Sequence, residues 1–84
     1  MKVVFTKNAA EDLKFWQKSK PDYAKKINKL ILAIITEPFA GIGKPEPLRH
    51  DLAGKWSRRI DKEHRLVYEV VGNQLIIHQC RYHY

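Results

Sequence analysis

The most unusual carboxylate of this 84-residue chain is Glu46, which lies in the segment Gly43-Lys44-Pro45-Glu46-Pro47-Leu48. Each proline fixes its own backbone φ angle, so the segment is stiff. Lys44, Arg49 and His50 surround Glu46 in the sequence. A carboxylate held among cations stays ionised, as a general base must. From the spacing alone a second interpretation stays open, in which Glu46 is a loop residue that makes local salt bridges.

The last four residues, Arg81-Tyr82-His83-Tyr84, form a second unusual stretch. Chain ends are usually frayed and polar, whereas these residues follow a predicted strand without any spacer. Histidine has an ordinary pKa near 6.5 and suits a general acid, and tyrosines can stack on nucleic-acid bases. Equally, the two tyrosines could pack on the core and leave His83 without a chemical role.

Positive charge is abundant: Lys and Arg total 16 against 9 Asp and Glu, which gives a formal charge of +7. Such an excess favours a polyanionic partner, although it does not separate RNA, DNA, an acidic protein and a merely soluble basic protein. A base for the 2′-hydroxyl, an acid for the leaving 5′-oxygen and cations for the phosphoryl oxygens would together cleave RNA without a metal. The candidate cations are Lys44, Arg49, Arg58, Arg59, Arg65 and Arg81.

The composition argues against disulfides, metals and membranes. The single cysteine, Cys80, excludes an internal disulfide and suits a reducing cytoplasm. His78 and His83 lie near it, but no second ligand pair follows, and a tetrahedral zinc site needs about four ligands. The longest apolar run, Leu30–Ile35, is far shorter than the ~20 residues that span a membrane, and Met1–Thr6 is too short and polar for a signal peptide. We expect a soluble cytoplasmic protein without a metal or cofactor.

The elements that must position these residues follow from the hydrophobic pattern. The first half of the chain predicts a strand over Lys2–Thr6 and a helix over Ala9–Lys18 with Asn8 as its cap. A second helix follows over Pro21–Thr36, with proline in its first turn. The stretch Glu37–Leu48, with three prolines and two glycines, is predicted to be irregular.

From Lys55 onward the apolar period changes to two, which predicts three strands over Lys55–Ile60, Arg65–Val70 and Gln74–Arg81. Gly72-Asn73 supplies a tight hairpin turn between the last two. We therefore predict a single domain, residues 1–84, of the α+β class. Its order is β-α-α-β-β-β, with two N-terminal helices packed on one face of a mainly antiparallel sheet.

The register of the first two of these strands predicts where their arginines lie. Placing Ile60 opposite Leu66 keeps the apolar side chains on one face. The simplest turn then has three unpaired residues, Lys62-Glu63-His64. In this arrangement Arg59 and Arg65 converge on the face that the helices leave uncovered.

Four motifs, in this order and ending at the last residue, carry a resemblance to a known family: Gly43-Lys44-Pro45-Glu46-Pro47-Leu48, Trp56-Ser57-Arg58-Arg59-Ile60, Glu63-His64-Arg65-Leu66-Val67-Tyr68 and Cys80-Arg81-Tyr82-His83-Tyr84. With them the sequence resembles the YoeB toxins, which belong to the RelE toxin superfamily. The resemblance extends over the whole chain and is strongest after Thr36.

The resemblance implies a microbial-ribonuclease-like fold and a metal-independent endoribonuclease that cleaves mRNA in the ribosomal A site. It implies Glu46 as general base, His83 as general acid and Arg65 as the cation that stabilises the phosphate.

Substrate placement is implied for Lys44, Arg59 and Tyr84. Arg49 stands where the family has a lysine, so the charge is kept but a point ammonium becomes a planar fork; we still include Arg49 among the substrate-binding residues.

The resemblance also implies partners: a homodimer, a YefM-like antitoxin that inserts a segment over the active face, the bacterial 70S ribosome with its A-site mRNA, and operator DNA only as the toxin–antitoxin complex. Two other functions stay open. A toxin of the RelE/ParE fold that inhibits DNA gyrase would need neither base nor acid, which the set Glu46, Arg65 and His83 provides. A non-catalytic nucleic-acid-binding module would explain the charge but not the aromatic–histidine terminus.

Overall fold

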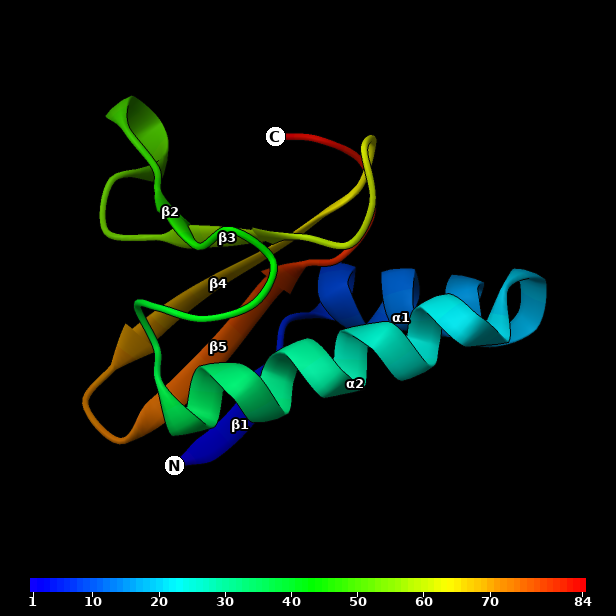
Figure 1. Cartoon of the computed structure of the whole chain (residues 1–84), viewed down its shortest axis with the longest axis horizontal. Coiled ribbons are helices and arrows are strands. Elements are labelled where there is room, and N and C mark those ends of the chain that lie inside the picture. The colour runs from blue at the N-terminus through cyan, green and yellow to red at the C-terminus, as the bar shows by residue number, and fades with distance from the viewer.

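In the computed structural model, which describes residues 1–84, two helices pack against one five-stranded sheet (Figure 1). The strand order is β1-β5-β4-β3-β2, with β1 parallel to β5 and every other pair antiparallel. The predicted α+β class and the mainly antiparallel sheet are confirmed. The elements are β1 (Lys2–Phe5), α1 (Lys7–Ser19), α2 (Pro21–Thr36), β2 (Glu46–Pro47), a 3-10 turn η1 (His50–Leu52), β3 (Trp56–Arg59), β4 (Arg65–Val71) and β5 (Gln74–Gln79).

Helix α1 begins two residues earlier than the sequence predicts. Thr6 is its N-cap, because its extended backbone lets the side-chain hydroxyl accept a hydrogen bond from the Ala9 amide at 3.1 Å. The prediction of Asn8 as the cap is wrong: its side-chain amide donates to the His78 carbonyl at 3.4 Å instead. The Thr6 hydroxyl also donates to that carbonyl, which ties the start of α1 to β5.

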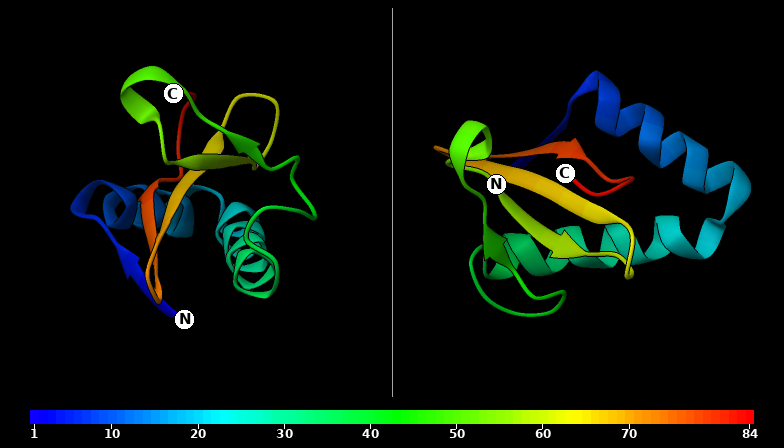
Figure 2. Two further views of the ribbon diagram at one scale, coloured as in Figure 1. Left: turned by 90° about the vertical axis from the view of Figure 1, so that its left-hand side faces the viewer. Right: turned by 90° about the horizontal axis from the view of Figure 1, so that it is seen from above.

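The core lies between the helices and one face of the sheet. From α2 it contains Ile27, Leu30 and Ile34, which follow a helical period and are almost fully buried. From the sheet it contains alternate residues of β4 and β5, such as Leu66 and Leu75. The C-terminus and the segment around β2 and η1 lie on the side of the sheet away from α2 (Figures 1 and 2). The sheet face on that side, opposite to the core, carries neither helix. It is called the outer face below.

The turn between β3 and β4 is wider than predicted. Arg58, not Ile60, lies opposite Leu66, and five residues rather than three connect the strands. Asp61 explains the wider turn, since its carboxylate accepts hydrogen bonds from the amides of Glu63 at 2.8 Å and His64 at 2.6 Å. The shift is two residues, so every side chain keeps its face.

The stretch between α2 and β3 is organised by a buried cation. Arg58 is 0% exposed, and its guanidinium donates to the carbonyls of Glu37 at 2.7 Å, Ala40 at 2.8 Å and Ile42 at 3.1 Å. It also donates to the Tyr68 hydroxyl. This stretch therefore has a fixed path, and its second half forms β2 and η1, which the sequence analysis did not predict.

Gly43 brings this stretch close to the core. Its φ of +83° favours glycine, and a Cβ there would lie 3.0 Å from Leu30 Cδ2 and 3.1 Å from Arg58 Cβ. Its carbonyl accepts a hydrogen bond from the Arg59 amide at 2.7 Å. This contact holds the segment that leads into β2 against the end of β3.

Strand β5 ends at Gln79 rather than at Arg81. The next amide, of Cys80, donates to the Asp12 carboxylate of α1 at 3.1 Å instead of to a neighbouring strand. The Cys80 carbonyl accepts from the Trp16 indole at 2.8 Å. Both bonds turn the chain out of the sheet just before its last four residues. No helix of the protein combines the length and the apolar character needed to cross a bilayer.

Candidate active site

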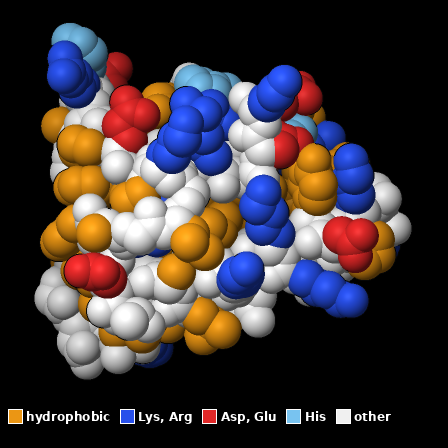
Figure 3. Space-filling view, viewed as in Figure 1, with side chains coloured by type: hydrophobic (Ala, Val, Ile, Leu, Met, Phe, Trp, Pro, Cys, Tyr) orange, Lys and Arg blue, Asp and Glu red, His pale blue; other side chains and the backbone are white.

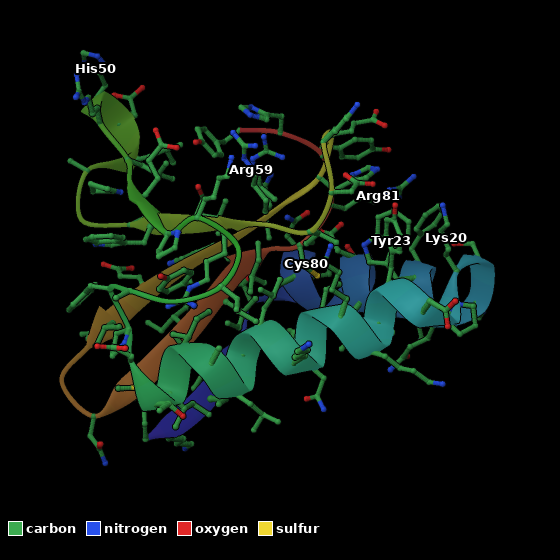
Figure 4. All side chains as sticks on the ribbon, in the orientation of Figure 1. Lys20, Tyr23, His50, Arg59, Cys80 and Arg81 are labelled. Atoms are coloured by element: carbon green, nitrogen blue, oxygen red, sulfur yellow. The ribbon has the colours of Figure 1, made fainter.

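Three strands place the candidate side chains on the outer face. Glu46 of β2 lies opposite Ser57 of β3, and Arg59 of β3 lies opposite Arg65 of β4. Residues directly opposite each other in an antiparallel pair project from the same face, so this register brings the carboxylate and both arginines to one surface. The predicted convergence of Arg59 and Arg65 is confirmed. Arg59 points toward the C-terminal segment in Figure 4.

Arg65 is held within this surface rather than extended from it. It is 8% exposed, and its Nη1 donates to the carbonyls of Asp61 at 2.8 Å, His64 at 3.1 Å and Lys62 at 3.2 Å. No buried side-chain nitrogen of the protein lacks a partner, so the unbonded nitrogens of this guanidinium keep contact with solvent. The fork therefore fixes the β3–β4 turn with one nitrogen and presents its remaining N–H groups outward.

The chain reverses direction at Tyr82. Its φ of +66° lies in the left-handed region, which non-glycine residues seldom adopt. Its amide donates to His64 Nδ1 at 2.7 Å, and its carbonyl accepts from the Arg65 amide at 3.0 Å. The two residues that follow Tyr82 return across the outer face.

This return brings the end of the chain to Glu46. The Tyr84 hydroxyl lies 3.4 Å from the Ser57 hydroxyl, and Tyr84 lines a cavity of about 290 Å³ together with Glu46, Arg49 and His50. His83 is exposed and stacks on Tyr84, with ring centroids 4.6 Å apart and planes at 30°. Two stretches that are far apart in the sequence, around Glu46 and at the terminus, thus meet on one surface.

Cations extend this surface toward α2. A cleft of about 760 Å³ is lined by Lys25, Lys26 and Lys29 of α2, by Lys44 and by Arg59. The two ion pairs of the protein, His64–Glu63 and His78–Glu69, both involve histidines. No Lys or Arg nitrogen lies within 4.0 Å of a carboxylate oxygen. One carboxylate, that of Asp61, also lines the cleft, so the charge of its lining is net positive. Figure 3 shows blue side chains gathered along the upper part of the molecule and over α2.

Two of the candidate cations lie elsewhere. Arg58 is fully buried and serves the loop described above, so its prediction as a phosphate ligand is wrong. Arg81 stacks its guanidinium carbon 3.5 Å from the Phe15 ring centroid and 4.5 Å from that of Tyr82. Figure 4 shows Arg81 on the side toward the start of α2, apart from Arg59.

The remaining histidines and the cysteine separate into different environments. His78 pairs with Glu69 at 2.9 Å, as expected of a structural residue. Cys80 is fully buried, and burial raises the pKa of its thiol to about 12. His64, which the sequence placed only in a turn, has a largely covered side chain that contacts the C-terminal tail. No three His, Cys, Asp or Glu side chains lie close enough together to share a metal ion.

Comparison with known proteins assigns this arrangement to a family. The sequence pattern of the YoeB-like toxins of bacterial type II toxin–antitoxin systems matches residues 5–84. The chain belongs to this family. Over 84 residues it is 52% identical to the toxin YoeB of Streptomyces coelicolor, and the match covers 100% of both chains.

Solved structures agree with this family membership. The YoeB/ParE toxin from Agrobacterium tumefaciens superposes with a TM-score of 0.98 at 51% identity, covering 100% of both chains. The YoeB–YefM complex and the YoeB dimer from Staphylococcus aureus superpose with TM-scores of 0.92 and 0.93 at 45% identity, each covering 100% of this chain and 98% of the other. The fold of this chain is thus that of the YoeB toxins, and its family is that of type II toxins.

Proposed function

We propose that this YoeB-family chain is a ribosome-dependent mRNA endonuclease, which cleaves mRNA in the A site of the bacterial 70S ribosome and so blocks translation. The observation that carries the proposal is the return of the C-terminal tail, which places Tyr84 in the cavity that Glu46 also lines. Glu46, the proposed base, and the tail that carries His83, the proposed acid, thereby lie on one surface with the paired Arg59 and Arg65.

The proposed chemistry needs no metal. Glu46 takes the proton of the 2′-hydroxyl, and the 2′-oxygen forms a bond to the phosphorus. The bond from phosphorus to the 5′-oxygen breaks, and His83 gives its proton to that leaving oxygen. The products are a 2′,3′-cyclic phosphate upstream and a 5′-hydroxyl downstream. Glu46 suits the base because it is exposed, lies on a proline-flanked strand and is held by pairing with β3.

The cations would divide between the transition state and the substrate. Arg65 is held by three backbone carbonyls, so its outward N–H groups are already oriented for the phosphoryl oxygens, which is the condition for electrostatic stabilisation. Arg59, Lys44 and Arg49 would bind neighbouring phosphates. Tyr84 would stack on a base next to the cleaved bond.

The ribosome is proposed as the place of cleavage because of the net positive charge of this surface. The cleft lined by lysines of α2 joins the candidate site through Lys44 and Arg59. A continuous positive surface of this kind attracts a highly charged partner such as ribosomal RNA. The protein is proposed to act in the cytoplasm, where ribosomes and mRNA lie.

The proposed regulation follows the Staphylococcus aureus relatives, which were solved with YefM and as a dimer. We expect a YefM-like antitoxin to cover the outer face with an acidic segment, the toxin to form a homodimer, and only the toxin–antitoxin complex to bind operator DNA. Electrostatic steering between the partners would weaken as salt rises.

Toeprinting of a defined mRNA on purified ribosomes tests the proposal. The wild-type protein should produce cuts in the A site, whereas Glu46→Gln and His83→Gln, which keep size and polarity, should not. A parallel supercoiling assay with DNA gyrase tests the other toxin function of this fold. Inhibition of gyrase without any cleavage of ribosomal mRNA would overturn the proposal.

A further inference from the structure

We infer that His64 is a positioning residue, whose Nδ1 holds the C-terminal tail on the outer face so that His83 and Tyr84 can reach the substrate. The contact behind this inference joins the Tyr82 amide to His64 Nδ1 at 2.7 Å, across 18 residues of sequence. The expected effect on cleavage rests on the proposed function. The hydrogen bond and the order of the tail do not, and they can be measured without any activity.

The hydrogen bond requires one particular form of the imidazole. A backbone N–H only donates, so Nδ1 must carry a lone pair and the ring proton must lie on Nε2. The neighbour on the other side favours the same form, since the Glu63 carboxylate lies 3.6 Å from His64 Nε2. The bond from the Tyr82 amide therefore requires the tautomer with a free Nδ1, and the Glu63 carboxylate lies where it attracts a proton on Nε2.

Besides the bond to His64, the side chains of the tail make few contacts: the Tyr84 hydroxyl lies 3.4 Å from the Ser57 hydroxyl, and the Arg81 guanidinium carbon lies 4.5 Å from the Tyr82 ring centroid. Tyr82 adopts a left-handed φ of +66°, a conformation that non-glycine residues seldom adopt, and the residue is 54% exposed. His83 and Tyr84 are exposed as well. The reversal at Tyr82 is secured by two hydrogen bonds, one from the backbone of Arg65 and one to the side chain of His64. Only the second depends on a side chain.

The His64 ring is itself fixed by the core. It lies edge-on to Trp16 with ring centroids 4.8 Å apart and planes at 80°, and Tyr23 lies 6.5 Å away. Its side chain is 12% exposed, and its amide donates to the Asp61 carboxylate at 2.6 Å. Because Nδ1 is fixed relative to α1 and to the β3–β4 turn, it also fixes where the tail lies relative to them.

Two substitutions separate the acceptor role of His64 from its packing, because one keeps the aromatic ring without the acceptor and the other keeps the acceptor without the ring. His64→Phe keeps an aromatic ring against Trp16 but has no acceptor. His64→Asn loses ring contacts but carries its amide oxygen on Cγ, where histidine carries Nδ1. If His64 acts as an acceptor, Asn should preserve the tail better than Phe; if it acts only by packing, the order should be reversed.

The experiment combines NMR of the tail with single-turnover cleavage on ribosomes. In the wild type we expect ¹⁵N shifts of an unprotonated Nδ1 and a coupling across the bond from the Tyr82 N–H. His64→Phe should leave the tail amides mobile and lower the cleavage rate by roughly 10-fold or more, because misplaced groups lose rate steeply. His64→Asn should stay closer to the wild type in both, in spite of a lower melting temperature.

A wild-type Nδ1 that carries the proton would overturn the inference without any variant. An ordered tail in His64→Phe, or a tail less ordered in His64→Asn than in His64→Phe, would overturn it as well. If the wild type itself does not cleave mRNA, the proposed function fails, while the NMR measurements still decide the role of His64.

Discussion

The two halves of the candidate site are held in place by different means. Glu46, Arg59 and Arg65 lie in the ladder of the sheet, where the backbone pairs with neighbouring strands. His83 and Tyr84 come after the last ladder residue and depend on the reversal at Tyr82. The strand half of the site, made up of Glu46, Arg59 and Arg65, should therefore lose its geometry only when the fold is disturbed. The tail half, made up of His83 and Tyr84, can be displaced in a protein that is otherwise intact.

Removal of His83 and Tyr84 is expected to have the largest effect and to break the site at its weaker half. A chain that ends at Tyr82 keeps the core, because both deleted residues are exposed. Cleavage on ribosomes should fall by about 10²–10⁴-fold, as is typical for a lost acid. Circular dichroism should be unchanged and antitoxin binding should be retained, and a chain that lacks Tyr84 alone separates the effect of losing Tyr84 from that of losing His83. A wild-type cleavage rate in the shorter chain would exclude His83 as the general acid.

Substitution of Arg65 tests the strand half. Arg65→Ala should lower the single-turnover rate by roughly 10²-fold or more, while ribosome binding changes much less. It should also lower the free energy of unfolding by about 1–3 kcal/mol, since Nη1 holds three carbonyls of the turn. Kinetics, ribosome pelleting and thermal unfolding measure the three effects. Equal losses in binding and in rate would make Arg65 a docking residue.

The neighbours Arg58 and Arg59 sharpen the comparison, because they face opposite sides of the same strand. Arg58→Met leaves three loop carbonyls without their donor and should cost about 2–4 kcal/mol of stability. The exposed Arg59→Met should change stability by no more than about 0.5 kcal/mol and weaken substrate binding instead. Chemical denaturation of both variants checks this. Similar stability losses in the two would contradict the assignment of Arg58 to the loop.

A smaller effect than that of Arg58 is expected at Asp61, which shapes the turn that carries His64. Partial burial acts to raise the pKa of the Asp61 carboxyl. Hydrogen bonds from the Tyr23 hydroxyl and from the amides of His64 and Glu63 outweigh this effect and lower the pKa to about 2. A carboxyl with a lowered pKa stabilises the fold above its ordinary value near 3.8 and loses that contribution as the pH falls toward 2.

Asp61→Asn should therefore reduce stability by about 1 kcal/mol at neutral pH, after allowance for solvent screening. The difference from the wild type should shrink as the pH falls below about 4. Thermal unfolding across this range is the measurement. A difference that does not change with pH would show that the charge of Asp61 contributes nothing.

Much of the strand half could be predicted from the sequence. The alternation of apolar residues fixes which side chains share a face, so Arg59 and Arg65 converge even though the predicted register was two residues out. Side chains alternate with a period of two, and an even shift changes no face. The wide turn depends on the Asp61 carboxylate and was not visible in the hydrophobic pattern.

The path of the loop and that of the tail could not be predicted, because both depend on contacts between distant residues. Arg58 reads as a free cation in the sequence, and only the carbonyls gathered around it explain its burial. The amide of the left-handed Tyr82 donates to His64, 18 residues earlier. Neither contact can be recognised from the residues next to it in the sequence. The available signals were an arginine at an apolar position of a strand and a histidine in a turn.

The central claim is that this protein cleaves RNA through the 2′-hydroxyl, and a single substitution in the message tests it most directly. Ribosomes are programmed with an mRNA that carries a 2′-deoxy nucleotide at the scissile position, beside an all-ribose control. We expect the control to yield a 2′,3′-cyclic phosphate and a 5′-hydroxyl, and the deoxy message to stay intact, because Glu46 would have no proton to take. Cleavage of the deoxy message at the same position would contradict the account.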